Sequence, residues 1–493
     1  MNKESLDDLE RLFNSHLYEP TPRIQKDIFS ALSDSKVPLS FKTKAVFYLR
    51  KHRKNIDINE LSKALSVNLK TAKEIMENPV STAYFPISNT EGAELSKLHS
   101  IKISNPNPVS TKKNINGALT VLRNLTGIGF FITFDDDFNG NSFMLAAFSA
   151  LTFFREKRLE RYSFSGVTDI SGNISEVEFL DKKRAVSLEK SKYLIDSTIV
   201  NHTSKLKYII QNQFIDVPFS ISVKSSGQDT TCKDSAVNNL KKLTNEIEKE
   251  GHIGFKVLKN LYGLKDEDFV YYIKESSLPD EDWSDYLKEA YAKVKNLKSK
   301  IKDKIAVIHF CFLAPSSFAF GLGALTGCKE PFAVYHYVDG TYKKVLDLKN
   351  TNERGLKKVC EDTTSLRCDF IKNGKDNVAL VYYMGTLNPL GDVKNYINKT
   401  ISKCDIIHCR LKSKQGNIPI GDWSKYINAM YESYNKTKSE SYQKRLFFFS
   451  VPVPIAFGFG AAVETFENGD VFNLKKSGEN TYVSVFNLKK LGF

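Results

Sequence analysis

A duplicated pattern in the last part of the chain most restricts the folds that this sequence can adopt. An apolar run beginning at residue 305 leads into Pro315 and a segment of small residues, and residues 445–460 repeat this order around Pro452. The prolines lie 452 − 315 = 137 residues apart. The same offset relates Gly321 to Gly458 and Val334 to Val471. A repeat of this length predicts two copies of one folding unit packed side by side.

Each copy has the pattern of a buried strand, a proline turn, a helix of small residues and a pair of strands. The apolar runs are continuous, which is typical of strands covered on both faces. Two such α/β halves would share a cleft at their strand ends, where open sheets bind ligands, and helix N-termini there would direct N–H groups at an anion. The candidate ligand-binding residues are Ser316, Ser317, Thr386, Asn388, Val453 and Pro454. For each of them a role as turn former or helix cap remains open.

The Pro-x-x-x-Ala-Phe-Gly-x-Gly turns at 315–323 and 452–460, with the strands after them, resemble the SAVED domain over residues 304–493. That domain is a fusion of two CARF-like, Rossmann-like halves. The resemblance implies an activating cyclic oligonucleotide, with cyclic tetra-adenylate the first expectation and a cyclic trinucleotide the second. It also implies head-to-tail assembly of copies of the chain when the ligand binds. His309 and His336 are interpreted as core histidines rather than ligands.

A second informative stretch runs from residue 129 to residue 183. A hydrophobic strand at 129–134 precedes an acidic turn, and Ser142 follows Gly140 at the head of an apolar helical run. Backbone N–H groups at a helix start lack intrahelical partners and can stabilise an oxyanion. Beyond the helix come Ser165 and, at the start of a further helix, Lys183.

This order of elements resembles the Lon protease domain, a serine endopeptidase with a Ser-Lys dyad. The resemblance makes Ser142 the nucleophile and Lys183, which is 183 − 142 = 41 residues further on, its base. Ser165 matches the hydroxyl residue that orients the lysine. The chain departs from the family where Phe143 and Met144 follow the nucleophile and where Glu178-Phe179 replaces a Gly-Gly pair. These bulkier residues bring the acyl pocket and the peptide preference into question.

The chemistry requires a lysine that is neutral near pH 7, because only a neutral amine removes the serine proton. Burial lowers the pKa of a lysine, and the flanking Lys182 and Arg184 would lower it further if they lie close. The alternative interpretation is a helix N-cap at Ser142 and a solvated lysine at 183.

Residues 1–97 are predicted to form a helical module. Residues 58–65 and 69–76 have the length and spacing of a helix-turn-helix, but the second helix offers only Lys70 and Lys73 for base contacts. A docking role is therefore favoured over DNA binding. Residues 98–235 form the expected Lon-like domain, ending in an apolar strand at 217–223 and a polar boundary at 225–231. Residues 236–303 read as a charged helical connector.

Several classes of protein are disfavoured by composition. The chain lacks the G-x-x-x-x-G-K-[ST] motif of nucleotide-driven unfoldases, so we expect an ATP-independent enzyme without a cofactor. Its eight histidines and seven scattered cysteines form no metal pattern and no disulfide framework, which predicts a reducing compartment, and no run is long enough to span a membrane. The protein is predicted to be cytoplasmic. The net charge of 71 − 57 = +14 is compatible with an anionic ligand.

The combination gives an α/β multidomain protein that resembles the Lon-SAVED effectors of type III CRISPR and related CBASS antiviral systems. The resemblance implies a protease that a cyclic oligonucleotide activates and that cuts a specific partner protein. Two alternatives remain open. One is a non-catalytic cyclic-nucleotide sensor or scaffold, and the other is a ligand-responsive transcription regulator that uses the N-terminal helices.

Overall fold

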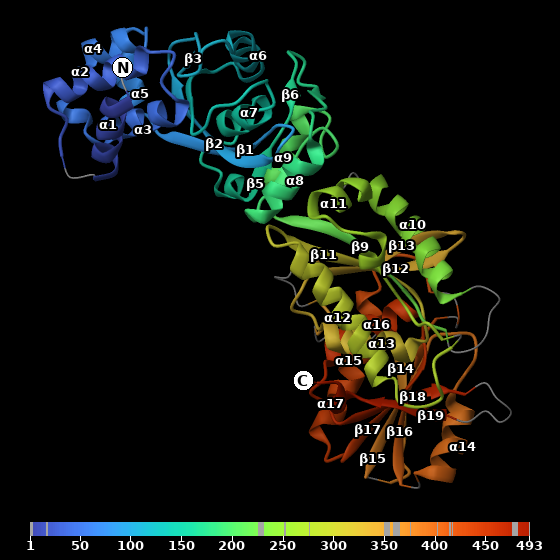
Figure 1. The fold of residues 1–493 in the computed structure, drawn as a ribbon. Coiled ribbons are helices and arrows are strands. Elements are labelled where there is room, and N and C mark those ends of the chain that lie inside the picture. The colour runs from blue at the N-terminus through green and yellow to red at the C-terminus, as the bar shows by residue number, and fades with distance from the viewer. Residues whose placement is uncertain are drawn as a thin grey trace. The chain divides into compact units, whose positions relative to one another are not determined.

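A computed structural model of the 493-residue chain describes residues 3–15, 18–224, 231–250, 253–275, 277–349, 355–357, 365–374, 376–401, 403–413, 416, 418–475 and 482–492. It divides into two compact units (Figure 1). The first comprises residues 1–212 with a short piece at 260–262, and the second comprises residues 213–259 and 263–493. No helix in the described part of the chain is long and apolar enough to cross a membrane.

The first unit begins with five helices, α1 (Lys3–Ser15), α2 (Pro22–Ser33), α3 (Leu39–Lys51), α4 (Ile58–Ala64) and α5 (Leu69–Glu77). Asp57 caps α4 and Asn68 caps α5, since each side chain accepts hydrogen bonds from the first backbone N–H groups of its helix. The predicted helix pair is therefore confirmed. These helices share one apolar core with the sheet residues Ile101, Ile103 and Phe131, so they pack against the sheet of the same unit.

The sheet of the first unit has the strand order β3-β4-β2-β1-β5-β8. Its strands are β1 (Val80–Ser88), β2 (Ala93–Ile103), β3 (Val109–Ser110), β4 (Gly129–Phe134), β5 (Tyr162–Phe164) and β8 (Tyr193–Ile195), and β6 (Val167–Thr168) pairs separately with β7 (Ile174–Ser175). Its remaining helices are α6 (Asn116–Thr126), α7 (Met144–Thr152), α8 (Leu180–Glu189) and α9 (Leu206–Gln211).

Helices α7 and α8 cover opposite faces of this sheet. Phe143, at the start of α7, packs on Phe134, which shares a face with Phe85. Ser187 of α8 bonds to Ser163, the register partner of Tyr84. Because Tyr84 and Phe85 are adjacent in a strand, they point to opposite faces.

The second unit contains two halves with matching sheets. The first sheet has the order β10-β9-β11-β12-β13 and the second the order β14-β16-β15-β17-β18-β19. The first half consists of β9 (Phe214–Ser222), α10 (Cys232–Lys249), α11 (Phe255–Tyr262), β10 (Val270–Tyr272), α12 (Ser284–Lys300), β11 (Ile305–Leu313), α13 (Ser316–Thr326), β12 (Phe332–Val338) and β13 (Thr341–Asp347).

The second half repeats this sequence of elements. It consists of β14 (Leu366–Ile371), β15 (Asn377–Tyr383), α14 (Leu390–Thr400), β16 (Cys404–Leu411), α15 (Ser424–Lys436), β17 (Lys444–Ser450), α16 (Val453–Val463), β18 (Gly469–Leu474), β19 (Tyr482–Asn487) and α17 (Leu488–Leu491). In each half a central parallel strand leads through a proline into a helix of small residues, as the repeat predicted.

The two halves meet through contacts that are reciprocal. A Cβ atom on Gly323 would lie 2.0 Å from the carbonyl oxygen of Phe457, and a Cβ on Gly460 would lie 2.0 Å from that of Phe320. Both pairs obey the 137-residue offset, and α13 and α16 lie side by side (Figure 1). Only glycine permits so close an approach of two helices. The repeat therefore builds a pseudo-two-fold arrangement.

A second reciprocal pair joins the halves at the starts of α12 and α15. The backbone N–H of Trp283 donates to Val485, and that of Trp423 donates to Val345. Each indole also donates to the carbonyl of a proline four residues earlier. The matching motif is Pro-x-x-Asp-Trp-Ser at 279–284 and 419–424, 140 residues apart, and it was not among the sequence predictions.

Three predicted boundaries are wrong. The helical module ends at Glu77 rather than at 97, because residues 80–103 alternate in burial and form β1 and β2. The strand at 217–223, assigned to the Lon-like domain 98–235, is part of β9 and pairs with β11 in the second unit. The connector 236–303 is part of the first half, since α10 and α12 bury Leu243 and Leu287, so this region starts at 213 rather than 304. Of the predicted polar boundary at 225–231, only Thr231 lies within the described residues.

The prediction that the cysteines form no disulfide is also corrected. Cys368 and Cys409 form a disulfide between β14 and β16, where the antiparallel register places them directly opposite each other. The two residues are 41 positions apart, so their pairing could not be read from sequence spacing. Cys360 lies outside the described residues.

Candidate functional site

Ser142 lies in the turn that leads into α7, at the end of β5. Its backbone carbonyl accepts a hydrogen bond from Gly166 (N···O 3.0 Å), and Leu145 of α7 donates to the Gly166 carbonyl (3.1 Å). Its side chain is partly exposed, while Phe143 next to it is fully buried. The predicted nucleophile thus lies beside the strand end that carries Ser165, in a turn held by hydrogen bonds to both the N–H and the carbonyl of Gly166.

Ser165 is fully buried, and its Oγ has no hydrogen-bond partner among the described residues. Its backbone N–H continues the β5–β8 ladder by donating to Ile195 (3.0 Å), so the chain is still extended at this position. Buried hydroxyls nearly always have a partner, because an unpaired one loses its bonds to water without replacement. An unpartnered hydroxyl at this position is available to orient a neighbouring group.

Lys183 is 4% exposed and lies in the first turn of α8. Burial lowers the pKa of its ammonium group, and Glu178 opposes this effect. Burial acts in this direction because the charged form loses more solvation than the neutral one. The alternative of a solvated surface lysine is therefore wrong.

The expected contribution of the flanking cations to that pKa is not found. Arg184 pairs with the buried Asp196 (Nη2···Oδ2 3.1 Å), and Lys182 donates to the carbonyl of Thr90 (2.6 Å). Neither contributes to the lowered pKa of Lys183. Their charges are directed elsewhere, so burial alone makes this lysine easier to deprotonate.

The register of α8 on β5 aligns Lys183 with Ser165. Ser187 of α8 bonds to Ser163 of β5, and α8 precedes β8, the parallel neighbour of β5, so the helix runs antiparallel to β5. Four residues back along the helix is about 6 Å, and two residues forward along the strand is about 6.6 Å. Starting from the Ser187–Ser163 bond, these two steps lead to Lys183 and Ser165.

Phe179 has a backbone conformation that usually requires glycine. It is the residue before α8 and has φ = 57°, in the left-handed region that disfavours side chains. Its ring is 37% exposed, and Lys182 lies over it at 5.5 Å. The turn before α8 thus has a conformation that favours glycine, although a phenylalanine occupies it.

The predicted ligand residues of the second unit divide into two groups. A cleft of about 650 Å³ is lined by Ser316 and Thr386, together with the turn at 450–452 that precedes α16. The hydroxyl of Ser317 is instead buried and donates to the carbonyl of Phe472 (2.8 Å). Asn388 caps the start of α14 by accepting from Leu390. Val453 and Pro454 begin α16, and neither is among the residues that line the cleft.

The chemistry of this cleft differs from that of a phosphate clamp. Its described lining contains no charged side chain, and its polar groups are hydroxyls, backbone groups and His336. Burial lowers the pKa of His336, so the imidazole is neutral at pH 7, and its ring lies 4.9 Å from that of Trp423. The prediction that His336 is a core residue without access to ligand is corrected, because both rings line the cleft. The Pro-x-x-Asp-Trp-Ser motif was the signal that could have located Trp423.

The pseudo-symmetric position is occupied by an ion pair between the two halves. The offsets of 137 and 140 map Val338 and Ile420 of the cleft to Lys475 and Asp280. Lys475 Nζ lies 3.3 Å from Asp280 Oδ2. The two halves therefore share a fold but present different chemistry at matching positions.

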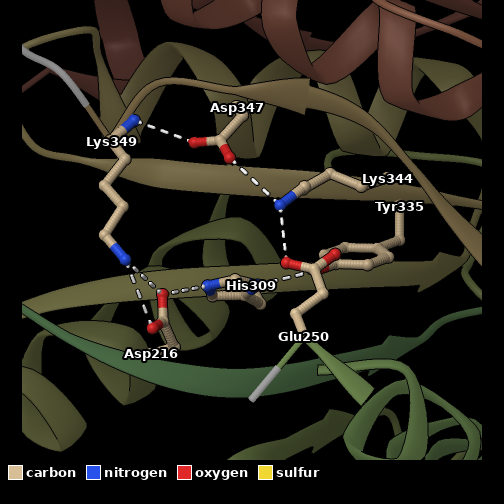
Figure 2. A network of polar contacts seen from close by, with 7 residues as sticks. All are labelled: Asp216, Glu250, His309, Tyr335, Lys344, Asp347 and Lys349. Atoms are coloured by element: carbon tan, nitrogen blue, oxygen red, sulfur yellow. Dashed lines mark hydrogen bonds and ion pairs between the residues drawn. The ribbon is translucent and has the colours of Figure 1, made fainter. Parts of the chain in front are cut away.

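The other histidine, His309, belongs to a closed network in the first half (Figure 2). Its Nε2 bonds to Asp216 (2.7 Å) and its Nδ1 to the Tyr335 hydroxyl (3.0 Å), while Lys349 approaches the same carboxylate (3.3 Å). Lys344 joins Glu250 and Asp347 nearby. The prediction of a satisfied core histidine is confirmed. Among the described residues, no group of three or more His, Cys, Asp or Glu side chains could hold a metal ion.

Comparison with known proteins gives remote structural similarities. No protein-family model and no curated protein matches the chain. The SAVED/CARF-domain receptor Cap4 of Acinetobacter baumannii, solved with the cyclic trinucleotide 3'3'3'-cAAA, aligns over 99% of this chain and 86% of its own, with 10% identity and a TM-score of 0.34. The Moraxella osloensis Cap4 receptor aligns over 56% and 50%, with 11% identity and a TM-score of 0.26. These scores carry no structural argument, and the fold and the sites rest on the contacts described above.

Proposed function

We propose that the protein is a serine endopeptidase with a Ser142–Lys183 dyad, activated when a cyclic oligonucleotide binds the second unit, and that it acts in prokaryotic antiviral defence. The observation that carries the enzymatic part is that Lys183 in α8 and Ser165 at the end of β5 are both buried, and that these two elements are joined by the Ser187–Ser163 hydrogen bond. A lysine with a lowered pKa aligned with an unpartnered buried hydroxyl, next to a serine at a helix start, is the arrangement that a Ser-Lys hydrolase requires.

In the proposed reaction, neutral Lys183 removes the proton of Ser142 Oγ, which attacks the peptide carbonyl carbon. In this reaction the unpartnered Ser165 Oγ would accept a hydrogen bond from an N–H of Lys183 Nζ, which would direct the lysine lone pair toward Ser142. The protonated lysine then gives its proton to the leaving amine, and the lysine activates a water molecule that releases the acyl group from Ser142.

The oxyanion donors follow from the hydrogen bonds at the start of α7. The N–H of Met144 donates to Asn141 (3.0 Å), and the N–H of Leu145 donates to Gly166. Among the described residues, this leaves the N–H groups of Ser142 and Phe143 for the developing negative charge. The side chain of Phe143 points into the core, so its bulk lies away from the side on which these N–H groups act.

The sensing part of the proposal rests on the pseudo-two-fold arrangement and on the cleft lined by Ser316, Thr386 and His336. Hydroxyls, backbone groups and two neighbouring rings suit the edges and faces of a nucleobase, whereas the uncharged lining does not neutralise phosphates with side chains. Binding would favour an active assembly of the chains only if the ligand prefers that state over the resting one. Cyclic tetra-adenylate is the first candidate ligand, and a cyclic triadenylate is the second.

The test combines ligand binding with peptide cleavage. Thermal unfolding of the full chain with cyclic di-, tri- and tetra-adenylate should show a rise in Tm with one of them, because a ligand of the folded state stabilises it. With that ligand, a library of denatured-proteome peptides should gain new N-termini, detected by mass spectrometry, and Ser142→Ala should abolish them. Ligand binding without new termini would support the non-catalytic sensor instead. Absence of a Tm shift with every cyclic nucleotide would refute the sensing part.

The transcription-regulator alternative depends on the helices α4 and α5. Lys70 and Lys73 are exposed on α5, but the helix buries its other face in the core of the first unit. A salt-dependent gel shift with the full chain would favour this alternative.

A further inference from the structure

Two buried serines connect the lysine helix to the sheet. Ser163 Oγ of β5 donates to Ser187 Oγ of α8 (2.8 Å), and Ser187 Oγ donates to the backbone carbonyl of Lys183 (2.7 Å). Both serine residues are fully buried. The chain of hydroxyls therefore runs from the strand that leads to Ser165 to the backbone of the candidate base.

Helix structure explains only one of the two hydrogen bonds that Ser187 makes. Serines within helices often bond back to the carbonyl four residues earlier, and Ser149 in α7 does so with Leu145 (2.8 Å) while fully buried. Ser187 makes the same bond but also accepts one from another element. Two apolar side chains could fill this position without any desolvation cost. The hydrogen-bonded serines therefore fix the register of α8 on β5 rather than add buried apolar area.

Besides the polar contacts of Lys182 with Thr90 and of Arg184 with Asp196, the position of α8 has few determinants. Among its described residues, only Lys183, Val186 and Ser187 are buried, so the helix lacks the broad apolar stripe that usually fixes a helix on a sheet. Its N-cap residue, Phe179, provides no side-chain capping bond. A helix held by so little apolar area can slide, and a slide of about 1 Å at a catalytic group costs on the order of 100-fold in rate.

We propose that Ser163 and Ser187 are positioning residues for Lys183: they lock α8 onto β5 in the register that aligns the base with Ser165 and keeps it buried. This inference rests on the proposed function, because it names the residues that hold the proposed base, Lys183, in place. It concerns residues that the resemblance to the Lon domain does not assign.

The primary experiment is Ser187→Ala in the full chain with the activating nucleotide. Cleavage of a peptide substrate should lose about 10- to 100-fold in kcat, while KM should change by less than about twofold, since the substrate contacts remain. The rise of activity with pH should move to higher pH, because a loosened Lys183 gains water and recovers a higher pKa. Ser187→Thr, which keeps the hydroxyl and the bond to the Lys183 carbonyl, should restore most of both properties.

Ser149→Ala is the matched control. It removes a buried helix serine with the same back-bond but no partner on the sheet, so kcat and the pH profile should be unchanged. An equal loss in Ser149→Ala and Ser187→Ala, or failure of Ser187→Thr to restore activity when its Tm matches the wild type, would overturn the positioning role.

A second measurement does not depend on catalysis. Lysines of the Ser142→Ala chain are methylated with ¹³C-formaldehyde and borohydride, and the Lys183 signal, assigned with Lys183→Met, is titrated by NMR. Adding Ser187→Ala should raise the pKa of Lys183, whereas adding Ser149→Ala should leave it unchanged. Equal pKa values in all three chains would overturn the inference. If the parent chain cleaves no peptide, the proposed function fails while this titration still decides the role of Ser187.

Discussion

Two buried polar clusters in this protein are built in opposite ways. Lys183 and Ser165 in the first unit include a hydroxyl without a partner, whereas Asp216, His309 and Tyr335 in the second unit satisfy one another. A satisfied network is what a core needs. Unpartnered buried hydroxyls also occur at Ser220 and Ser222 of the second unit, so the hydroxyl of Ser165 indicates a candidate site only together with the buried Lys183. The difference separates a candidate site of chemistry from a structural element, although both clusters contain groups typical of catalysis.

The second half of the same unit confirms that the satisfied network is not required by the fold. The register of the strands equates Asp216 with Asn377 (216 + 161), His309 with Leu446 (309 + 137) and Tyr335 with Phe472 (335 + 137). Leu446 and Phe472 belong to an apolar cluster of the second half. The same three positions are thus occupied by a hydrogen-bonded triad in one half and by Asn377, Leu446 and Phe472 in the other.

The largest expected effect follows from removing the base. Lys183→Met should lower the cleavage rate by about 10³-fold or more, because the Ser142 hydroxyl loses its activation. Stability should not fall, since a thioether of similar length replaces a group whose charge is costly to bury. Cleavage assays and thermal unfolding of the full chain measure the two quantities. If the variant unfolds at a clearly lower temperature and still cleaves peptides, Lys183 has a structural role and is not the catalytic base.

The next largest effect concerns the satisfied cluster. His309→Leu should destabilise the second unit by roughly 1.5–3 kcal/mol, because a charge-assisted hydrogen bond is lost while Asp216 and Tyr335 stay buried. The triple variant Asp216→Asn, His309→Leu, Tyr335→Phe carries the residues of the other half and should recover most of this loss. Denaturant unfolding checks both variants. If the triple variant is less stable than the single one, the two halves are not equivalent at these positions.

Sequence reasoning predicted the duplication, the helix pair at the N-terminus and the segments that hold Ser142, Ser165 and Lys183. Several of its errors share one cause. Strand partners cannot be read from a local pattern: β9 follows the first unit in sequence but pairs with β11, which begins 91 residues after the start of β9 (305 − 214). Likewise, the burial of the Ser317 hydroxyl and the position of Trp423 in the cleft depend on contacts between the two halves. A sequence repeat predicts that the two halves pack together, but it does not show which side chains make the contacts.

The pH dependence of activity and stability tests the role of Lys183 separately from that of Ser165. The pKa of Lys183 is lowered by burial, so below that folded-state value the base is protonated and activity should fall about tenfold for each unit of pH. The contribution of Lys183 to the free energy of unfolding also increases with pH. Between the lowered folded pKa and the ordinary unfolded one, the unfolded chain binds more protons, so this group's contribution to stability rises with pH. The stability advantage of Lys183→Met over the wild type should therefore shrink as pH increases, which denaturant unfolding at several pH values would show. A constant difference would mean that Lys183 titrates alike in both states.

The smallest effect tests whether the turn before α8 carries strain for the benefit of the base. Phe179 has a left-handed backbone, which costs an ordinary residue about 1–2 kcal/mol. Phe179→Gly should therefore stabilise the first unit by about 0.5–1 kcal/mol, the remainder being offset by the entropy of glycine and the lost contact with Lys182. Phe179→Ala is the matched control, because it loses the same ring contact but keeps the strain, so it should gain nothing. If Phe179→Gly is more stable but cleaves more slowly, the strained turn helps to hold Lys183 in place. If its rate is unchanged, the two buried serines are sufficient to fix the helix, and Phe179 has no part in positioning the base.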